Sequence, residues 1–399
     1  MTSPEVAVPR ARYELGRVLG RGSHAVVHEA VDRVSGARVA IKCFPFGSPR
    51  ADREARALEA LAHRFVVPFL GREDGVHQTQ LVQSCGLRSL EDERRPGTVA
   101  SVAWRIAQLS AAIDAIHARG WTHRDVKPAN VLVAPDGDLW LADFSTALRD
   151  DEPDLFEGTP HYMSPEAARL DSQGPRRARD WYALGVLLFE LATGEVPFSD
   201  EDPMEILRKQ SEAPRPSLKG TRFAALDSRL ASWLRVEPRL RAGGGRELIR
   251  SLLEALPRCE KTSRVSIVSN DSTRGEVMAR LVADEAPSLR VRLSSEAADL
   301  VIFDSESPAP ESLAACGAVV VVGSIHETAG ACTRGADAVG WRSWNALSTR
   351  LALRCWGASH EAPGWWGMPV DLPVHVQGIA RRAARSTRVI ELPSWRNGP

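Results

Sequence analysis

The chain has 399 residues, of which 43% are hydrophobic and 26% charged, and its formal net charge is zero. This length predicts two or three domains, and the composition is that of an ordinary globular protein. A neutral charge balance gives no general attraction to nucleic acid or to a membrane surface, so we expect neither as a partner.

The cysteine pattern and the amino terminus bear on the compartment. The six cysteines are scattered and form no CxxC pair, which argues against a zinc site or a disulfide framework and favours a reducing compartment. The first residues, MTSPEVAVPRARYELG, contain no apolar signal core. No run approaches the roughly 18 apolar residues of a membrane span, so a cytoplasmic protein without a membrane span is expected.

The predicted elements begin after a leader, residues 1–12. Residues 15–32 and 38–44 alternate as strands around a glycine turn. Helical spacing then predicts three helices, with the sequences DREARALEALAH, VAWRIAQLSAAIDAIHARG and DWYALGVLLFELATG. Together these elements predict one α+β domain over residues 13–258.

A different rhythm follows a linker at residues 259–264. The strands RVSIVS, LRVRL, DLVIF and AVVVV alternate with helical segments, and WNALSTRLALRCW predicts a closing helix. Such alternation indicates a parallel, doubly wound α/β sheet, here over residues 265–356. The tail, residues 357–399, is rich in Trp, Arg and Pro, and we expect it to pack on the domains or to be solvated.

The first domain carries side chains suited to phosphates. Gly20 and Gly22 lie between two strands, where glycines let a backbone turn approach a phosphate closely, although a plain hairpin explains them equally well. Lys42 ends a strand, and Glu54 follows on a helix. A lysine braced by a glutamate can hold nucleotide phosphates; the alternative is an ordinary surface ion pair.

The segment HRDVKPAN, residues 123–130, is harder to explain as structure alone. Asp125 can receive a hydroxyl proton, Lys127 can neutralise a transferring phosphate, and Asn130 can offer an amide oxygen to a metal. Asp143 follows after a hairpin with an Asp-Gly turn and adds a second oxygen ligand. Only five of the 51 basic residues are lysines, and Lys127 and the strand lysine are two of them. These positions need a compact point charge, which favours selection for chemistry.

Taken in order, these motifs resemble the bacterial Hanks-type serine/threonine protein kinases. GRGSHA resembles their glycine-rich loop, VAIK their strand lysine, and HRDVKPAN the serine/threonine form of their catalytic loop. GTPHYMSPE, residues 158–166, resembles the end of their activation loop, and Asp180 with Gly185 resembles their DxxxxG helix start. The resemblance implies a bilobal kinase fold that uses ATP and Mg²⁺ and phosphorylates protein substrates.

The resemblance also implies roles for the polar residues. Asp125 would be the catalytic base, Lys127 would neutralise the transferring phosphate, and Lys42, braced by Glu54, would hold the other phosphates. The ATP-binding residues would be Gly20, Arg21, Gly22, Ser23, His24, Ala25, Val27, Ala40 and Lys42.

The remaining implied roles are metal binding, acceptor choice and structure. Asn130 and Asp143 would hold Mg²⁺, and Thr159 would line the acceptor site and favour Ser and Thr. Glu166 and Arg241 would form a structural ion pair.

Two positions depart from the family pattern. Ala25 replaces the third glycine of the loop, and Ser145 replaces the glycine after Asp-Phe. Serine restricts the backbone φ that glycine would allow, so we expect Ser145 to affect loop motion more than metal binding. The alternative function is a pseudokinase scaffold that acts only by binding partners.

The activation loop is acidic and has no central hydroxyl. In the family, Arg124 pairs with a loop phosphate. In this chain the negative charge of that phosphate could be supplied instead by the loop carboxylates Asp150, Asp151, Glu152, Asp154 and Glu157. A solvated acidic loop is the favoured interpretation of these residues. The competing hypothesis is that their charge replaces the loop phosphate, so that activation does not require loop phosphorylation.

The second domain resembles the receiver domain of response regulators. Asp304, at the end of DLVIFD, would be the phosphoacceptor, Ser324 the switch hydroxyl, and Asp271 with Asn270 the Mg²⁺-binding acid. Arg342 stands where that family has lysine, and the short stretch before DLVIFD leaves little room for a second helix. We favour a degenerate receiver on which a signalling partner or a second copy docks over one that is phosphorylated.

Overall fold

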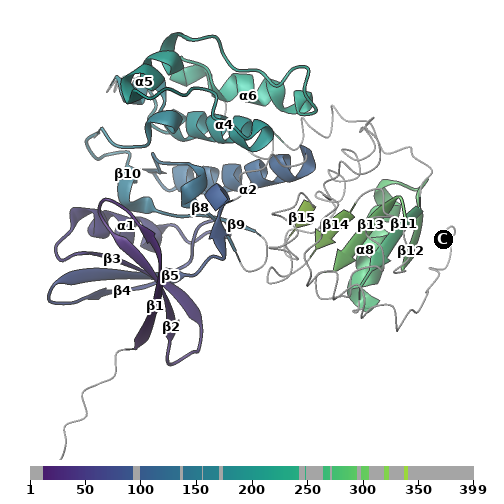
Figure 1. Ribbon diagram of the computed structural model, residues 1–399, viewed down its shortest axis with the longest axis horizontal. Helices are drawn as coiled ribbons and strands as arrows, with labels where there is room; N and C mark the ends of the chain where they lie inside the picture. The colour runs from purple at the N-terminus through teal and green to yellow at the C-terminus, as the bar shows by residue number, and fades with distance from the viewer. Residues whose placement is uncertain are drawn as a thin grey trace, which may run out of the picture.

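The computed structural model describes residues 12–92, 99–134, 138–154, 156–169, 174–241, 248, 264–269, 272–293, 298–304, 319–322 and 337–339. In that part of the chain, a strand-rich lobe is followed by a helical lobe and then by a parallel sheet (Figure 1). None of its helices is long and apolar enough to cross a membrane. The predicted tail and nearly all of the predicted leader and linker lie outside the described residues.

The strand-rich lobe is built on a five-stranded antiparallel sheet in the order β1-β2-β3-β5-β4. Its strands are β1 (Tyr13–Arg21), β2 (Val26–Asp32), β3 (Arg38–Pro45), β4 (Phe69–Asp74) and β5 (Gln78–Ser84). The predicted pair of strands around a glycine turn corresponds to β1 and β2. Lys42 lies on the central strand β3, opposite Val27 on one side and Leu81 on the other.

Helix α1 (Pro49–Ala60) connects the cores of the two lobes. Proline at its first position suits the helix start, where no backbone donor is needed. Ala51 and Ala55, one turn apart, pack on Phe44 and Leu81 of the sheet, whereas Leu58 belongs to the core of the helical lobe. An amphipathic helix of this kind holds its position by packing on both sides.

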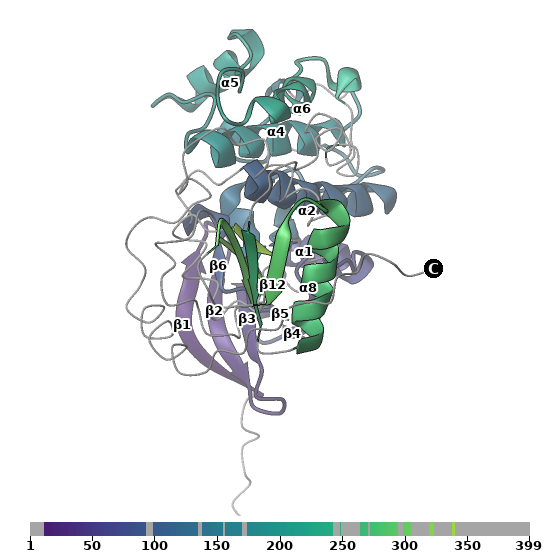
Figure 2. The same cartoon turned by 90° about the vertical axis from the view of Figure 1, so that its right-hand side faces the viewer.

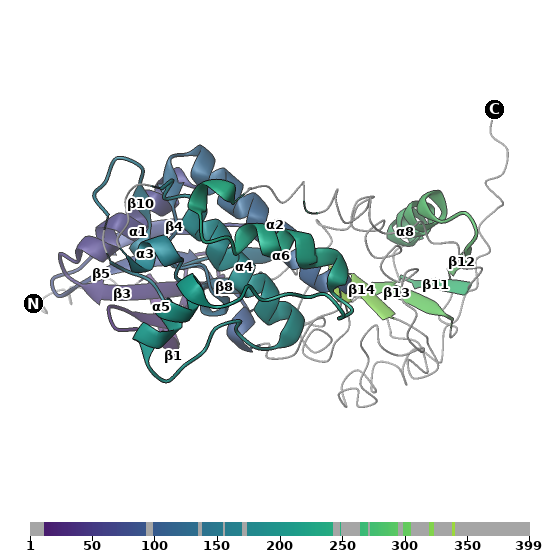
Figure 3. The same ribbon diagram turned by 90° about the horizontal axis from the view of Figure 1, so that it is seen from above.

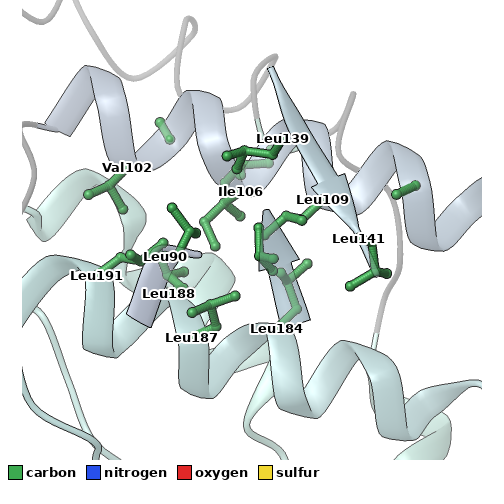
Figure 4. Packing of buried hydrophobic residues seen from close by; sticks show 14 of the residues in the cluster. Leu90, Val102, Ile106, Leu109, Leu139, Leu141, Leu184, Leu187, Leu188 and Leu191 are labelled. Carbon is green, nitrogen blue, oxygen red and sulfur yellow. The ribbon is translucent and has the colours of Figure 1, made fainter. Parts of the chain in front are cut away.

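The helical lobe contains α2 (Val99–Ala118), α3 (Pro165–Ala168), α4 (Ala178–Thr193), α5 (Pro203–Glu212) and α6 (Asp227–Trp233). Its core lies between α2 and α4, where Ile106 and Leu109 face Leu184 and Leu188 (Figure 4). At Gly185 an added Cβ would lie 2.9 Å from Leu234 Cδ2, so the close packing of α4 on the end of α6 requires a glycine there.

Short elements connect the lobes and carry the polar loops. The short strands are β6 (Arg88–Ser89), β7 (Trp121–Thr122), β8 (Val131–Val133), β9 (Leu139–Leu141) and β10 (Leu148–Arg149). The 3₁₀ turns are η1 (Leu90–Asp92), η2 (Pro128–Asn130), η3 (Phe144–Thr146), η4 (Pro160–Tyr162), η5 (Ala224–Leu226) and η6 (Pro238–Leu240). The predicted hairpin after the catalytic-loop motif is the β8–β9 pair.

The carboxy-terminal sheet is parallel, in the order β12-β11-β13-β14-β15. Its elements are β11 (Arg264–Val268), α8 (Ser272–Glu285), β12 (Arg290–Leu293), β13 (Leu300–Asp304), β14 (Val319–Val322) and β15 (Asp337–Val339). Helix α8 lies against β11 and β12 (Figures 2 and 3), and β15 is the strand beside α2 (Figure 1). The strand β15 was not predicted from the sequence, because its three residues carry little apolar pattern.

Candidate active site

Lys42 lies between two carboxylates that come from distant parts of the chain. Its Nζ donates to Glu54 Oε2 on α1 and to Asp143 Oδ1 after β9, at 2.7 Å in each case. Gln83 Nε2 donates to the other oxygen of Glu54 at 3.0 Å, a partner that the sequence analysis did not identify. Glu54 is fully buried, and a buried carboxylate needs partners of this kind.

The electrostatics of this triad favour the charged forms of Lys42 and Asp143, whereas burial raises the pKa of the Glu54 carboxyl. Burial would disfavour the Lys42 ammonium, but the attraction of its two carboxylate partners outweighs burial. The pKa of Lys42 is therefore raised. The pKa of Asp143 is held well below its ordinary value by the Lys42 ammonium and by hydrogen bonds from Ser145. The site thus presents an ionised carboxylate beside a fixed cation.

A second cluster gathers the polar residues of the catalytic-loop motif. Asp125 Oδ1 accepts a hydrogen bond from the Thr159 hydroxyl at 2.8 Å, and its Oδ2 accepts one from Asn130 Nδ2 at 2.9 Å. Lys127 Nζ lies 2.8 Å from Asp125 Oδ2 and donates to Thr159 Oγ1 at 2.7 Å. The cluster therefore places a carboxylate and an ammonium on one hydroxyl oxygen.

The backbone around these residues is held in a conformation that side chains rarely adopt. Arg124 has a φ of 75° and Asp143 a φ of 61°, and they are the only described non-glycine residues with positive φ. Such positions cluster at functional sites, where surrounding bonds hold the strain. At Arg124 the backbone is held by Asp180, which accepts hydrogen bonds from the backbone N–H groups of His123 at 2.9 Å and Arg124 at 2.8 Å.

Asp180 is itself held by a buried imidazole. His117 Nε2 lies 2.8 Å from Asp180 Oδ2. Burial would raise the pKa of Asp180, but the hydrogen bonds from His117 and the backbone outweigh burial and lower it. His117 was not singled out from the sequence, because a histidine on an apolar helix face carries no signal of its partner 63 positions away.

The two residues predicted to hold a metal lie at adjacent strand ends. Asn130 precedes β8 and Asp143 follows β9, and the backbone N–H of Ala142 donates to the Asn130 carbonyl at 2.8 Å. Among the described residues, no group of three His, Cys, Asp or Glu side chains is placed to hold a metal ion.

The glycine turn between β1 and β2 closes with a hydrogen bond from Gly22 N to Ala25 O at 3.0 Å. Gly20 pairs with Val27 across the hairpin, and Val27 pairs with Lys42 on the next strand. Ala25 packs on the apolar cluster of Phe44 and its neighbours, which gives a physical reason for a methyl group at this position. The other predicted nucleotide contacts, Arg21, Ser23, His24 and Ala40, lie on these same strands and turn.

Ser145, the departure from the family pattern, makes specific contacts. Its hydroxyl donates to Asp143 Oδ1 at 2.6 Å, and its backbone N–H lies 3.3 Å from the same oxygen. Its carbonyl accepts from Arg53 Nη1 at 3.0 Å. Because Ser145 does not have positive φ, this arrangement does not require a glycine.

Two further predicted sites differ in how much of them is described. Glu166 and Arg241 form a bidentate pair, with Nη1–Oε1 at 2.6 Å and Nη2–Oε2 at 2.8 Å. Asp304 is the last residue of β13, but its side chain lies outside the described residues, as do Asn270, Asp271, Ser324 and Arg342.

Comparison with known proteins places these motifs in a family. Residues 13–270 match the protein kinase domain family. CBL-interacting protein kinase 29 of Oryza sativa subsp. japonica is 36% identical over 222 residues, which cover 50% of this chain and 49% of the relative. Serine/threonine-protein kinase PknD of Mycobacterium tuberculosis is 32% identical over 288 residues, 66% of this chain and 43% of the relative. PrkC, a serine/threonine-protein kinase of Bacillus subtilis, is 32% identical over 224 residues, 52% of this chain and 34% of the relative. The matches thus span half or less of each relative's length.

Proposed function

Because the chain belongs to the protein kinase family, we propose that it is a serine/threonine protein kinase that transfers the γ-phosphate of ATP to protein Ser and Thr hydroxyls. The observation that carries the proposal is the contact of one hydroxyl with both Asp125 and Lys127. A hydroxyl held there can pass its proton to a carboxylate beside a cation that neutralises the incoming phosphate.

The proposed roles follow from charge and position. Asp125 orients the acceptor hydroxyl and takes its proton, and Lys127 offsets the charge that develops on the transferred group. Lys42, fixed by Glu54, binds the remaining phosphates. The protein forms no covalent intermediate in such a reaction, so its contribution is orientation and electrostatic stabilisation.

The donor set fits magnesium and ATP. Mg²⁺ prefers oxygen ligands and retains sites for phosphate oxygens, and the Asp143 carboxylate with the Asn130 amide offers such ligands from adjacent strand ends. When bound, Mg-ATP would supply the phosphoryl group and part of its charge neutralisation.

The proposal is tested by incubating the full chain with radiolabelled ATP, Mg²⁺ and casein as a generic acceptor. We expect label on phosphoserine and phosphothreonine after acid hydrolysis. Label on phosphotyrosine alone would contradict the serine/threonine assignment, and no label on any protein, the chain included, would favour the pseudokinase scaffold.

Replacing Ser145 with glycine is expected to lower kcat about two- to fivefold, because a glycine adds roughly 0.5–1 kcal/mol of backbone freedom to a loop that must stay ordered. The KM for ATP should change less, since the Asp143 carboxylate remains. Initial-rate kinetics of Ser145→Gly and Ser145→Ala separate two causes. Alanine removes only the hydroxyl that contacts Asp143, so equal effects of the two variants would mean that backbone freedom is not responsible. A large gain in Mg-ATP affinity would also contradict this expectation.

We further propose that the carboxy-terminal sheet is a degenerate receiver-like domain that serves as a docking module for a signalling partner. Its strand order β12-β11-β13-β14-β15 supports this, because it is the 2-1-3-4-5 order of flavodoxin-like folds. Only residues 294–299 join β12 to β13, fewer than the dozen or so of an ordinary parallel crossover. This departure supports the degenerate form.

Acetyl phosphate, a small phosphate donor, tests whether Asp304 is a phosphoacceptor. We expect no gain in intact mass by a phosphoryl group and no acyl-phosphate label on the wild-type full chain. A label that appears on the wild type and disappears in Asp304→Asn would contradict the degenerate form and show a phosphorylated receiver.

The proposed compartment is the reducing cytoplasm, since Cys43 and Cys85, the described cysteines, are both free thiols.

A further inference from the structure

The acidic segment of the activation loop lies against arginines from three separate elements. Glu157 Oε1 accepts from Arg50 Nη2 at 2.5 Å, and its Oε2 accepts from Arg53 Nη1 at 3.1 Å. Both arginines belong to α1. Arg124 Nη1, in the catalytic loop, lies 3.8 Å from the same Oε2. One carboxylate therefore connects α1 to the loop that carries Asp125.

Asp154 completes the arrangement from the other side of Arg124. Its Oδ2 lies 2.5 Å from Arg179 Nη2 on α4, and its Oδ1 lies 3.5 Å from Arg124 Nη2. The Arg124 side chain is only 2% exposed. A guanidinium buried this far must be compensated by negative charge, and Asp154 and Glu157 provide that charge.

The contact with α1 bears directly on the triad that holds Lys42. Arg50 and Arg53 are one turn apart on α1, so they share a face, and Arg53 is the neighbour of Glu54. A carboxylate that fixes these arginines therefore also fixes the helix that carries Glu54, whose Oε2 lies 2.7 Å from Lys42 Nζ. Arg53 donates in addition to the Ser145 carbonyl, which ties the segment after Asp143 to the same helix.

The contact with the catalytic loop bears on the acceptor side of the site. Gly158 follows Glu157 with a φ of 136°, and a Cβ there would lie 3.2 Å from the Arg124 carbonyl oxygen. The loop therefore passes close over the catalytic loop at this point. Thr159, the next residue, places its hydroxyl on Asp125.

The hydroxyl groups of this loop are engaged or buried. Ser145 donates to Asp143, Thr146 to the His123 carbonyl, Thr159 to Asp125 and Tyr162 to Glu190. Ser164, the remaining hydroxyl between Asp143 and Glu166, is 1% exposed. In this arrangement, none of them is free on the surface to carry a phosphate that could reach Arg124.

We propose that Glu157, supported by Asp154, is a positioning residue for phosphoryl transfer: its carboxylate supplies the charge that a loop phosphate would add, and it holds α1 and the catalytic loop in the active arrangement. Phosphorylation orders a loop by creating charge-assisted hydrogen bonds to arginines, and Arg50 and Arg53 already donate such bonds to Glu157. This inference rests on the proposed kinase function.

The test starts from full chain produced with a co-expressed phosphatase and checked by intact mass before and after the assay. We expect the unphosphorylated wild type to transfer phosphate at a rate that loop phosphorylation does not raise. Glu157→Gln keeps the side-chain shape and removes the charge, and it should lower kcat about tenfold or more, the range of a typical coupling between sites. Its KM for ATP should change less than its kcat.

Four further variants sharpen the result. Arg50→Gln removes the opposite end of one ion pair and should lower kcat in the same direction, and Glu157→Gln/Arg50→Gln should lose less than the product of the single effects. Glu157→Asp retains the charge and should recover part of the rate. Asp151→Asn is the matched control, because Asp151 lies in the same acidic segment with its side chain 74% exposed, and its rate should stay close to wild type.

Amide hydrogen exchange supplies a readout that does not depend on activity. Glu157→Gln should raise exchange in α1 and leave α5 unchanged. An unphosphorylated wild type that is inactive until its loop is modified overturns the inference while leaving the kinase function intact, as does a Glu157→Gln variant with wild-type kcat. If the wild type transfers no phosphate with or without a loop phosphate, the proposed function fails and the role of Glu157 in transfer fails with it. In an active wild type, unchanged exchange of α1 in Glu157→Gln overturns the positioning role alone.

Discussion

Replacing Asp125 with asparagine is expected to lower kcat by about 10²–10⁴-fold, the usual contribution of a positioned general base. Asparagine has nearly the same shape and can still accept a hydrogen bond from a hydroxyl, but it cannot take the proton. The Asp125 carboxylate is the acceptor for the Thr159 hydroxyl at 2.8 Å, so its loss removes the only described carboxylate in contact with that oxygen. Steady-state transfer to casein measures the effect.

Mg-ATP binding separates lost chemistry from lost structure in this variant. Lys42, Glu54 and Asp143 form a cluster of their own around the lysine ammonium, so Asp125→Asn should bind Mg-ATP with near wild-type affinity and unfold at a similar temperature. The exposed Asp151→Asn substitution serves as the control for a lost negative charge. Equal transfer by wild type and Asp125→Asn would mean that the activity does not come from this site, and the kinase proposal would fall.

Much of this site could be predicted from the sequence because its chemistry is concentrated in short segments. Asp125, Lys127 and Asn130 lie within six positions of one another, so the loop that holds them is readable as a motif. Lys42 and Glu54 were predicted as a pair because a strand and the helix that follows it are neighbours in space. In these cases, local sequence and tertiary contact coincide.

The contacts that support the site could not be predicted in the same way. Arg50 and Glu157 are 107 positions apart, and an arginine on an exposed helix face reads as solvated until its partner is seen. The positive φ of Arg124 likewise leaves no trace in composition, since it is held by hydrogen bonds to Asp180 on α4. The sequence indicates that the carboxylates of the acidic loop could supply the negative charge of a loop phosphate. Which of them reaches Arg124 depends on the path of the loop.

The carboxy-terminal sheet shows the same division. Alternating strands and helices predicted a parallel sheet, and the strands β11 to β14 lie close to the predicted segments. Strand order depends instead on which faces of the strands bury each other, and β15, with only three residues between polar segments, carries too little pattern to be read.

The ion pair of Glu166 and Arg241 is expected to contribute strongly to stability. The two side chains are 3% and 0% exposed, and Arg241 also donates to the carbonyls of Arg235, Ala178 and Val236 at 2.8–3.1 Å. Removing one member of a buried pair leaves an uncompensated charge, which costs about 3–5 kcal/mol. Arg241→Met should therefore lower the free energy of unfolding by that amount, measured by urea denaturation of the full chain.

A double-variant cycle distinguishes a buried charge from a packing defect. Glu166→Met/Arg241→Met removes both charges, so it should be less destabilised than the sum of Glu166→Met and Arg241→Met. It should still be less stable than the wild type, because three backbone carbonyls lose a donor and each unsatisfied buried group costs about 1–3 kcal/mol.

Arg241→Lys tests geometry at constant charge: an ammonium cannot make two parallel bonds to a carboxylate, so lysine should recover only part of the loss. Additive effects in the double variant would show that packing around Tyr182, whose ring centroid lies 4.9 Å from the Arg241 guanidinium carbon, contributes more than the ion pair.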